Sequence, residues 1–505
     1  MRRSKAKKNI ITSLILQIVT IICGLILPRL IIKTYGSATN GLINSITQFL
    51  SYIALLDSGF GLVVKSLLYK PISEKNDREI KKILHATNKF FSNIAFIFLV
   101  YIIILCTIYP LIVKNQFDYL FIISLIIVLS ISTISEYFIG ITYSIYIQAS
   151  QENYIISTIQ IVTTILNTII SAILIKLNFS IQIVKLITMA LFAIRPFLLK
   201  EYVKRKYKLN INHKEKSNYI IKQKWDGLAQ HIAFVVHSNT DIAILSIFST
   251  MKEVSVYSVY LLIINGIKKL VESFSNGIDA SWGDMIAKKE HNNLIDKFEL
   301  YEYLYHTFST VIFTCTLLLI TPFVHVYTKD ITDYNYIRVC FGYIIVMAEF
   351  LWAIRLPYSS LVSASGKFKE TRNGAIIEAV LNIIISMILV YKFGIIGVAI
   401  GTLISMTIRT IEFIIFTSRK VLDRNVTKPF LHLISIIVTT IICYAIFHII
   451  DFKYPNSYIS WIKEGVIVSI YVGIIVVITN MIMFRKETKR ILNIAARTIK
   501  NYINT

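Results

Sequence analysis

Apolar residues form long runs along almost the whole chain, and short basic or polar stretches separate them. A helix needs about 20 apolar residues to cross the hydrocarbon core of a bilayer. Fourteen runs approach or exceed that length, so the pattern predicts fourteen membrane-spanning helices. The predicted spans lie near residues 10–33, 42–67, 90–113, 119–147, 154–175, 181–203, 225–249, 254–280, 304–327, 337–363, 374–391, 396–417, 430–450 and 464–484.

The basic residues between the spans predict the orientation of the chain. With the N-terminus in the cytoplasm, the inner segments hold 34 lysines and arginines and the outer segments hold seven. Cytoplasmic loops carry such an excess of Lys and Arg. We therefore expect both termini in the cytoplasm of a multi-pass protein. The first apolar run is too long for a signal peptide and predicts a retained span.

Composition narrows the class of protein. Hydrophobic residues make up 55% of the chain and charged residues only 16%, which excludes an ordinary soluble enzyme and a disordered chain. The net charge of +24 fits inner loops that face anionic lipid, so no nucleic-acid partner is expected. The five cysteines lie inside apolar runs and predict neither a disulfide framework nor a metal site. No nucleotide-binding or hydrolase motif is present, so we expect no catalytic residues, no cofactor and no enzyme activity.

An internal repeat relates the two halves of the chain. The stretch YSIYIQAS at 143–150 matches YSSLVSAS at 358–365, and Asn167 and Ser171 match Asn382 and Ser386. Six predicted spans separate the copies, so both cross the membrane in the same direction. Such parallel repeats occur in transporters, whose substrates bind near the midplane between the two copies.

The repeat and the spans together predict an all-α membrane protein. Two six-helix bundles would surround a central cavity, and two further helices would follow. The expected parts are an N-lobe (1–203), a cytoplasmic linker (204–224), a C-lobe (225–417), helices 13 and 14 (430–484) and a basic cytoplasmic tail (485–505).

Several cations lie within the predicted spans, where an uncompensated charge is costly. Arg195 and Arg409 occupy matched positions about 12 Å from the inner end of their spans. They either face the cavity and bind an anionic head group, or extend to the lipid head groups. Arg355, Lys65 and Arg29 are further candidates for substrate binding, and Arg29 lies near the outer face.

Carboxylates within the spans are candidates for ion coupling. Glu136 and Glu349 occupy matched mid-membrane positions, where they would either carry protons or form structural hydrogen bonds. Asp241 follows His237 by one helical turn, so both share a helix face. Asp57 completes this group. The sequence leaves open whether a proton or a sodium gradient is used.

Four stretches carry a resemblance to a known family. They are PRLIIKTYGSATNGLINSITQFLSYIALLDSGFG (28–61), NTDIAILSIF (239–248), RLPYSSLVSASGKFKETR (355–372) and GIIGVAIGTLIS (394–405). With them the chain resembles the polysaccharide-transport, or O-antigen flippase, branch of the multidrug/oligosaccharidyl-lipid/polysaccharide (MOP) exporter superfamily. These patterns of glycines and small polar residues specify the fold better than the substrate. One departure is that QASQENY (148–154) lacks the basic residues of SASGKFK (363–369).

The resemblance implies a function. Family members move undecaprenyl-diphosphate-linked oligosaccharides to the outer leaflet of the bacterial plasma membrane by alternating access, for O-antigen, capsule or exopolysaccharide synthesis. Arg195, Arg355, Arg409 and Lys65 would then lie on the substrate path, with a polysaccharide polymerase and glycosyltransferases as partners. The alternative is an ion-coupled multidrug or metabolite antiporter of the same superfamily. A membrane enzyme of the glycan pathway is disfavoured, because the longest outer segment, 451–463, is too short for a catalytic loop.

Overall fold

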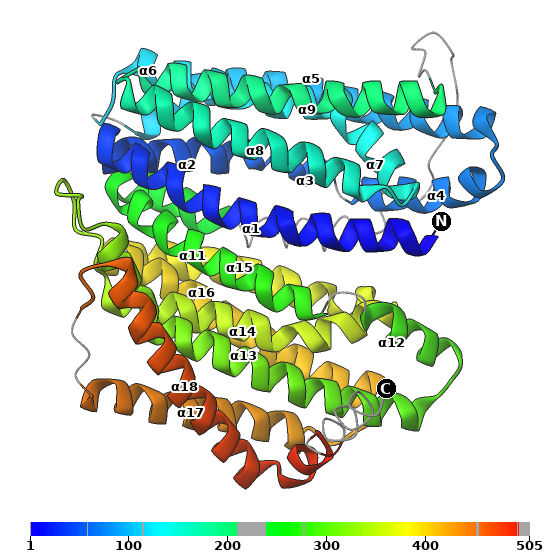
Figure 1. Cartoon of the computed structure of the whole chain (residues 1–505), viewed down its shortest axis with the longest axis vertical. Helices are drawn as coiled ribbons and strands as arrows, with labels where there is room; N and C mark the ends of the chain where they lie inside the picture. Colours follow the sequence, from blue (N-terminus) through cyan, green and yellow to red (C-terminus); the bar gives the residue numbers. More distant parts are fainter. Residues whose placement is uncertain are drawn as a thin grey trace. The chain divides into compact units, whose positions relative to one another are not determined.

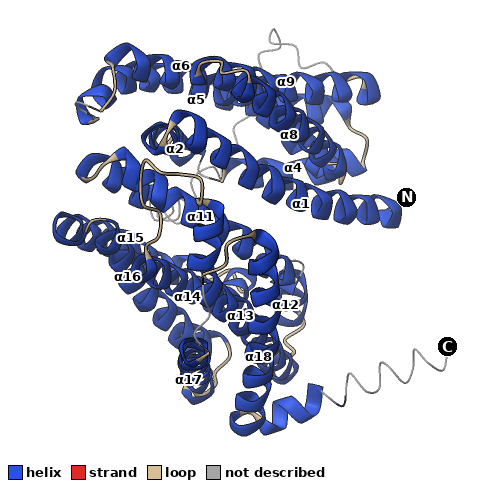
Figure 2. Ribbon diagram, turned by 60° about the vertical axis from the view of Figure 1, so that its left-hand side comes forward, coloured by secondary structure: helices blue, strands red, loops and turns tan. Residues whose placement is uncertain are grey.

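The computed structural model describes residues 2–57, 59–113, 116–209, 239–275, 278–450, 454–491 and 493. Throughout these ranges the regular structure is helical, and no strand occurs in them (Figures 1 and 2). By packing, the chain forms two units, residues 1–258 and 259–505. The lobe boundaries drawn from the repeat, 1–203 and 225–417, remain predictions.

The first unit contains the helices up to the start of α11. They are α1 (Arg2–Tyr35), α2 (Ser37–Ser51), α3 (Ala54–Asp57), α4 (Phe60–Ser73), α5 (Asp77–Ile112), α6 (Tyr119–Ser135), the π-helix η1 (Glu136–Gly140), α7 (Ile141–Ala149), α8 (Asn153–Lys176), α9 (Ile181–Tyr207) and the short helix Asn239–Phe248.

The second unit contains most of α11 (Met251–Ser275) and everything that follows. Its other elements are α12 (Ile278–Ala287), α13 (His291–Tyr327), α14 (Val339–Ala364), α15 (Phe368–Phe393), α16 (Ile395–Phe416), the π-helix η2 (Thr417–Val421), α17 (Thr427–Ile449) and α18 (Tyr458–Met483).

Twelve helices among the described residues are long and apolar enough to cross a membrane. The predicted second span, 42–67, is instead divided among α2, α3 and α4. Gly59 caps α4 with a φ of 73°, a left-handed conformation that glycine adopts without strain, so the chain turns there. Of the predicted span 225–249, the described part is the helix Asn239–Phe248. The twelve long helices thus correspond to twelve of the fourteen predicted spans.

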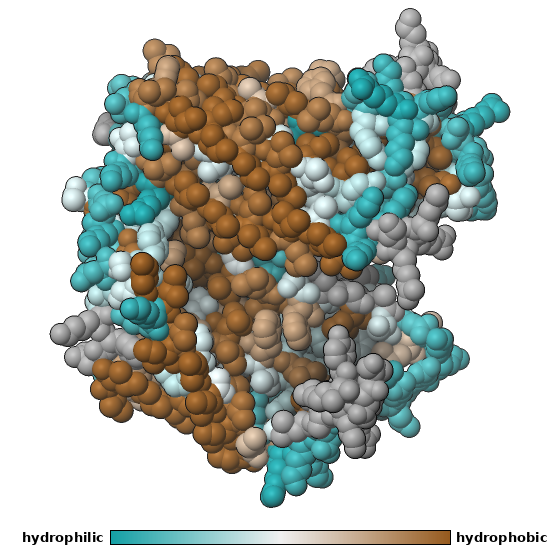
Figure 3. Space-filling model, viewed as in Figure 1, coloured by the Kyte–Doolittle hydropathy of each residue, from teal (hydrophilic) through white to brown (hydrophobic). Residues whose placement is uncertain are grey.

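Large apolar side chains cover the outer faces of these helices. On α1, Ile10, Ile18 and Ile22 are each more than half exposed. Figure 3 shows the same hydrophobic cover over α5, α8 and α9 and over α17 and α18, while hydrophilic residues gather toward helix ends. Soluble monomers do not expose apolar surfaces of this extent. The chain is a multi-pass membrane protein.

A close backbone contact joins α2 to α11 within the first unit. A Cβ added at Gly41 would lie 1.7 Å from the Met251 carbonyl oxygen, so only glycine fits. Around this contact Asn40 Nδ2 donates to Ser255 Oγ at 2.8 Å, and Ser45 Oγ lies 2.5 Å from Ser246 Oγ. Small and polar residues at such interfaces let membrane helices approach closely.

The repeat reappears as polar contacts between corresponding helices of the two copies. Ser171 Oγ of α8 lies 3.2 Å from Thr188 Oγ1 of α9. In the second copy, Asn382 Nδ2 of α15 donates to Thr402 Oγ1 of α16 at 3.0 Å. Thr188 and Thr402 are 214 residues apart, the same offset as Arg195 and Arg409. The polar residues that reveal the repeat in the sequence thus join equivalent helix pairs in both units.

Glu152 ties together three segments of the first unit. It lies between α7 and α8, and only 1% of the residue is exposed. Its carboxylate pairs with Lys5 Nζ at 2.9 Å and Lys206 Nζ at 2.6 Å, and it accepts from Tyr202 Oη at 2.8 Å. Burial by itself would raise the pKa of Glu152, but the hydrogen bonds from these partners outweigh it and lower the pKa to about 2.

Replacing Glu152 by glutamine should therefore destabilise the first unit at neutral pH by up to about 3 kcal/mol, because the pKa falls from 4.5 to about 2 and each pKa unit corresponds to about 1.4 kcal/mol. A carboxylate with a lowered pKa stabilises the fold above its ordinary pKa and loses that effect as the pH falls toward the lowered value. The difference in melting temperature between wild type and Glu152→Gln should hence shrink between about pH 4.5 and pH 2. Glu201→Gln, which removes an exposed pair with Arg205, is the control and should change little. If the difference in melting temperature between wild type and Glu152→Gln is as large at pH 3 as at neutral pH, this account of Glu152 is wrong.

Candidate substrate and ion sites

Arg195 of α9 is held in place by neutral groups. Its Nε donates to Thr163 Oγ1 at 2.7 Å and its Nη2 to Thr164 Oγ1 at 3.1 Å, both from α8. The guanidinium carbon lies 3.9 Å from the centre of the Phe192 ring. None of the described carboxylates forms an ion pair with it. These contacts fix the direction of the guanidinium without neutralising its charge.

A cavity of about 310 Å³ inside the first unit brings Arg195 and Glu136 together. Its other lining residues come from α6, η1, α7, α8 and α9: Ser132, Thr133, Tyr137, Ser144, Ile156, Ile159, Gln160, Phe192 and Leu199. Glu136 opens the π-helix η1, and single π-turns of this kind often occur at functional sites. A Cβ added at Gly140 would lie 2.5 Å from the Glu136 carboxyl group, so this glycine makes room for the side chain.

A second cavity in the first unit contains Lys65. It measures about 540 Å³ and is lined by Ala6, Asn9, Lys65, Tyr69, Gln148, Gln151 and Asn153. Apart from alanine, every lining residue can donate a hydrogen bond. Lys65 and Arg195 thus line separate cavities of the same unit.

In the second unit, Arg355 and Arg409 belong to a buried cluster of four charges. Arg355 Nη1 lies 2.7 Å from Glu378 Oε1, and Arg409 Nε lies 3.5 Å from Glu378 Oε2. Arg409 Nη1 also pairs with Glu412 Oε2 at 2.7 Å. Gly374 faces this cluster closely, since a Cβ there would lie 1.8 Å from a Glu412 oxygen. Only 4% of the Arg409 side chain is exposed, so Arg409 does not extend to lipid head groups.

The candidate carboxylates also have partners. Lys268 Nζ of α11 lies 2.7 Å from Glu349 Oε2 and 4.2 Å from the centre of the Trp352 ring. Tyr257 Oη donates to Asp241 Oδ2 at 2.6 Å, and Asp241 is buried. Glu349 is therefore held by a cation, whereas its matched residue Glu136 faces a cavity.

The remaining candidates lie apart from these groups or outside the described set. Arg29 is a half-buried residue of α1. Asp57 is the last residue of α3, and its side chain is not described. His237 lies outside the described residues.

Two features of these sites escaped sequence reasoning. The threonines that hold Arg195 carry no charge and so gave no signal. Glu378 was recognisable as an intramembrane charge, but its contact with Arg409 joins α15 to α16 and needs the fold to be seen. One signal was present: at the offset of 215 residues that relates this part of the repeat, Glu378 replaces Thr163, just as Arg409 corresponds to Arg195.

Comparison with known proteins identifies the fold. No family model matches the chain, and no curated protein matches its sequence. Among solved structures, it is similar to the lipid II flippase MurJ in an inward closed conformation, with a TM-score of 0.67 and 16% identity. That match covers 94% of this chain and 98% of MurJ.

Multidrug transporters also match. An inward-facing multidrug resistance MATE family transporter of the MOP superfamily has a TM-score of 0.59 and 13% identity, covering 79% of this chain and 94% of the transporter. The eukaryotic MATE transporter AtDTX14 has a TM-score of 0.55 and 12% identity, and the match covers 85% of this chain and 98% of AtDTX14. The chain has the fold of MOP superfamily transporters. This fold fits the predicted arrangement of two parallel bundles followed by two further helices.

Proposed function

We propose that the protein is a flippase for an undecaprenyl-diphosphate-linked oligosaccharide in the bacterial plasma membrane. The observation that carries the proposal is the likeness to the lipid II flippase MurJ, which extends over 94% of this chain and 98% of MurJ. The motif-level resemblance to O-antigen flippases supports the polysaccharide branch of this function. In this proposal the translocated oligosaccharide is used for surface polysaccharide synthesis, and a polymerase and glycosyltransferases act in the same pathway.

Cations that line cavities support an anionic substrate. Arg195 keeps its charge beside a 310 Å³ cavity, and Lys65 lines the 540 Å³ cavity. A guanidinium can donate two parallel hydrogen bonds to a phosphate group, which makes Arg195 the first candidate for the diphosphate. Arg355 and Arg409 serve the same role only if they exchange Glu378 for substrate, and Arg29 is the outer candidate.

An ion-coupled multidrug or metabolite antiporter is the second candidate function. The MATE transporters among the structural matches favour it. In that function the intramembrane carboxylates Glu136, Glu349, Asp241 and Asp57, with His237, would bind the coupling ion, a proton or sodium. The two functions predict opposite consequences when the gene is removed.

A deletion strain separates these functions. Loss of the protein should remove surface polysaccharide and leave drug susceptibility unchanged. Arg195→Ala combined with Arg409→Ala should reduce surface polysaccharide at least tenfold, because the anion loses its donors on both matched helices. Arg205→Ala, at the exposed end of the helix that carries Arg195, should leave it normal. Normal surface polysaccharide with the double variant present in the membrane would refute the anion-binding role. Raised drug susceptibility with intact polysaccharide would favour the antiporter.

A further inference from the structure

We propose that the cavity between Arg195 and Glu136 is an anion site that takes up one proton with each anion it binds. The proposal rests on the flippase function, since the anion would be the diphosphate group of the substrate. It adds a role for Glu136, whose charge decides whether Arg195 can receive that group. The site lies wholly within the first unit, among α6, η1, α7, α8 and α9.

The two copies of the repeat have diverged at this position. Arg409 pairs with Glu378 of α15 and Glu412 of α16, so carboxylates neutralise its charge in this structure. At the place of Glu378, 215 residues earlier, the first copy has Thr163, which accepts a hydrogen bond from Arg195 but brings no charge. Among the described residues, Arg195 in the first copy therefore has no carboxylate in an ion pair with it, whereas Arg409 in the second copy has two.

In the described part of the chain, Glu136 is the one other charged residue that lines this cavity with Arg195. The two residues attract each other electrostatically but do not form an ion pair within the described structure. The other groups around the cavity carry no charge at neutral pH: Ser132 and Thr133 from α6, Tyr137 from η1, Ser144 from α7 and Gln160 from α8. The net charge of the cavity is therefore set by this one carboxyl group and one guanidinium.

Protonation of Glu136 switches the cavity between two states. With Glu136 ionised, the cavity is neutral overall, and an incoming anion would meet a carboxylate. When the carboxylate takes a proton, the Arg195 charge is uncompensated, and its Nη1 is not engaged by Thr163 or Thr164. The anion then restores neutrality. Because each binding event favours the other, proton and anion are thermodynamically linked, and the linkage is reciprocal.

The chemistry that fits this site is a phosphate or diphosphate group. A volume of about 310 Å³ lies at the lower end of the range for small-molecule sites, and a phosphate group accepts the paired hydrogen bonds that a guanidinium donates. The group could belong to a lipid or be free in solution. Undecaprenyl diphosphate and inorganic diphosphate are therefore the two probes.

The test measures binding of each probe to the full-length protein in lipid nanodiscs between pH 8 and pH 6. Undecaprenyl diphosphate should bind the wild type more tightly as the pH falls, by up to tenfold per pH unit beyond the change seen with Glu136→Gln. Glu136→Gln should bind about tenfold more tightly than wild type at pH 8, and its remaining pH dependence reports the titration of the probe itself. If the site binds a lipid, inorganic diphosphate should bind more weakly than undecaprenyl diphosphate. If the two probes bind equally well, the site is one for free diphosphate and not for the lipid.

Two further variants keep the result independent of folding. Arg195→Gln should weaken binding at least tenfold at every pH. Thr163→Glu should do the same while leaving Arg195 in place, because it gives the first copy the carboxylate of the second. Melting temperatures identify any variant that is merely unfolded. Glu136→Gln that binds like wild type across the pH range would overturn the proton linkage, even if Arg195→Gln confirms the substrate site. A wild type that binds no undecaprenyl diphosphate at any pH would overturn the proposed function as well.

Discussion

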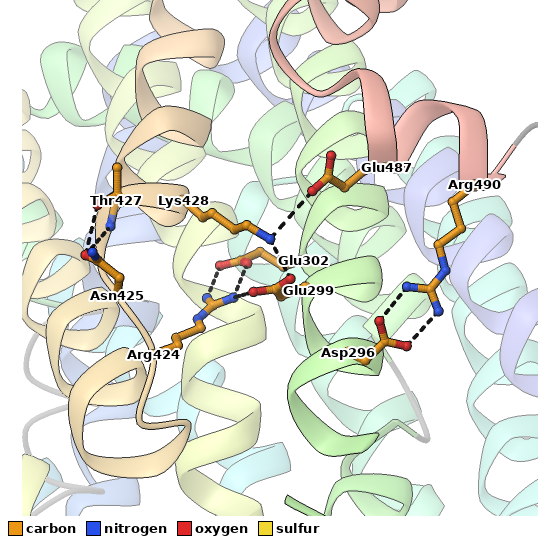
Figure 4. A network of polar contacts seen from close by, with 9 residues as sticks. All are labelled: Asp296, Glu299, Glu302, Arg424, Asn425, Thr427, Lys428, Glu487 and Arg490. Atoms are coloured by element: carbon orange, nitrogen blue, oxygen red, sulfur yellow. Dashed lines mark hydrogen bonds and ion pairs between the residues drawn. The ribbon is translucent and has the colours of Figure 1, made fainter. Parts of the chain in front are cut away.

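Replacing Arg424 by methionine will lower the melting temperature of the protein sharply. Arg424, between η2 and α17, forms two hydrogen bonds with the Glu302 carboxylate of α13, at 2.8 and 2.7 Å (Figure 4). Only 1% of the Glu302 side chain and 7% of the Arg424 side chain are exposed. Without its partner, the buried Glu302 carboxylate would be uncompensated, and losing one member of such a pair costs about 3–5 kcal/mol.

The surrounding network offers matched controls for this experiment. Lys428→Met removes a pair with Glu299 in which the lysine is half exposed, so its effect should stay below about 1 kcal/mol. The double variant Glu302→Leu with Arg424→Met should recover much of the loss, because it removes both charges together. Thermal unfolding in detergent, followed by tryptophan fluorescence, gives the three values. If Arg424→Met and Lys428→Met have equal effects, the buried pair does not stabilise the second unit.

Replacing Glu378 by leucine will have an effect of similar size through the four-charge cluster. Glu378 is the common partner of Arg355 and Arg409, and 8% of its side chain is exposed. Its removal leaves Arg355 with no carboxylate partner in the cluster and Arg409 with Glu412 alone. We expect a loss of about 3–5 kcal/mol, again on the scale of an uncompensated buried charge.

The outcome also distinguishes a structural from a substrate-binding role for the two arginines. If the cluster is structural, Glu378→Leu lowers the melting temperature, and added undecaprenyl diphosphate does not restore it. If Arg355 and Arg409 bind substrate, the probe should take the place of the carboxylate and raise the melting temperature of the variant above the shift seen in wild type. Glu412→Gln is the milder control, because that residue is about one-third exposed and contacts only Arg409.

Hydropathy predicted the twelve long apolar helices among the described residues and their order, because the length of an apolar run is a direct consequence of bilayer thickness. It could not predict the division of the second span into α2, α3 and α4. The stretch DSG at 57–59 is typical of a turn, but a count of apolar residues passes over it, and the turn depends on the backbone conformation of Gly59. The repeat was visible because matched polar residues are rare in such a chain.

The sequence located the candidate charged residues, but it did not show which of them form ion pairs. Arg195 and Arg409 look alike in the sequence, yet one faces a cavity and the other is neutralised by two glutamates. Glu136 and Glu349 differ in the same way, because Lys268 reaches Glu349 from another helix. Which charges pair depends on contacts between helices, and spacing along one helix does not encode them.

The close approach of α2 to the helix Asn239–Phe248 offers a place for an engineered disulfide bond. Ser45 and Ser246 place their hydroxyl oxygens 2.5 Å apart, so cysteines at both positions would meet under mild oxidation. If these segments separate during each turnover, the stapled protein would stop in one conformation, and a reducing agent would release it. If they move as one piece, oxidised and reduced protein would work equally fast.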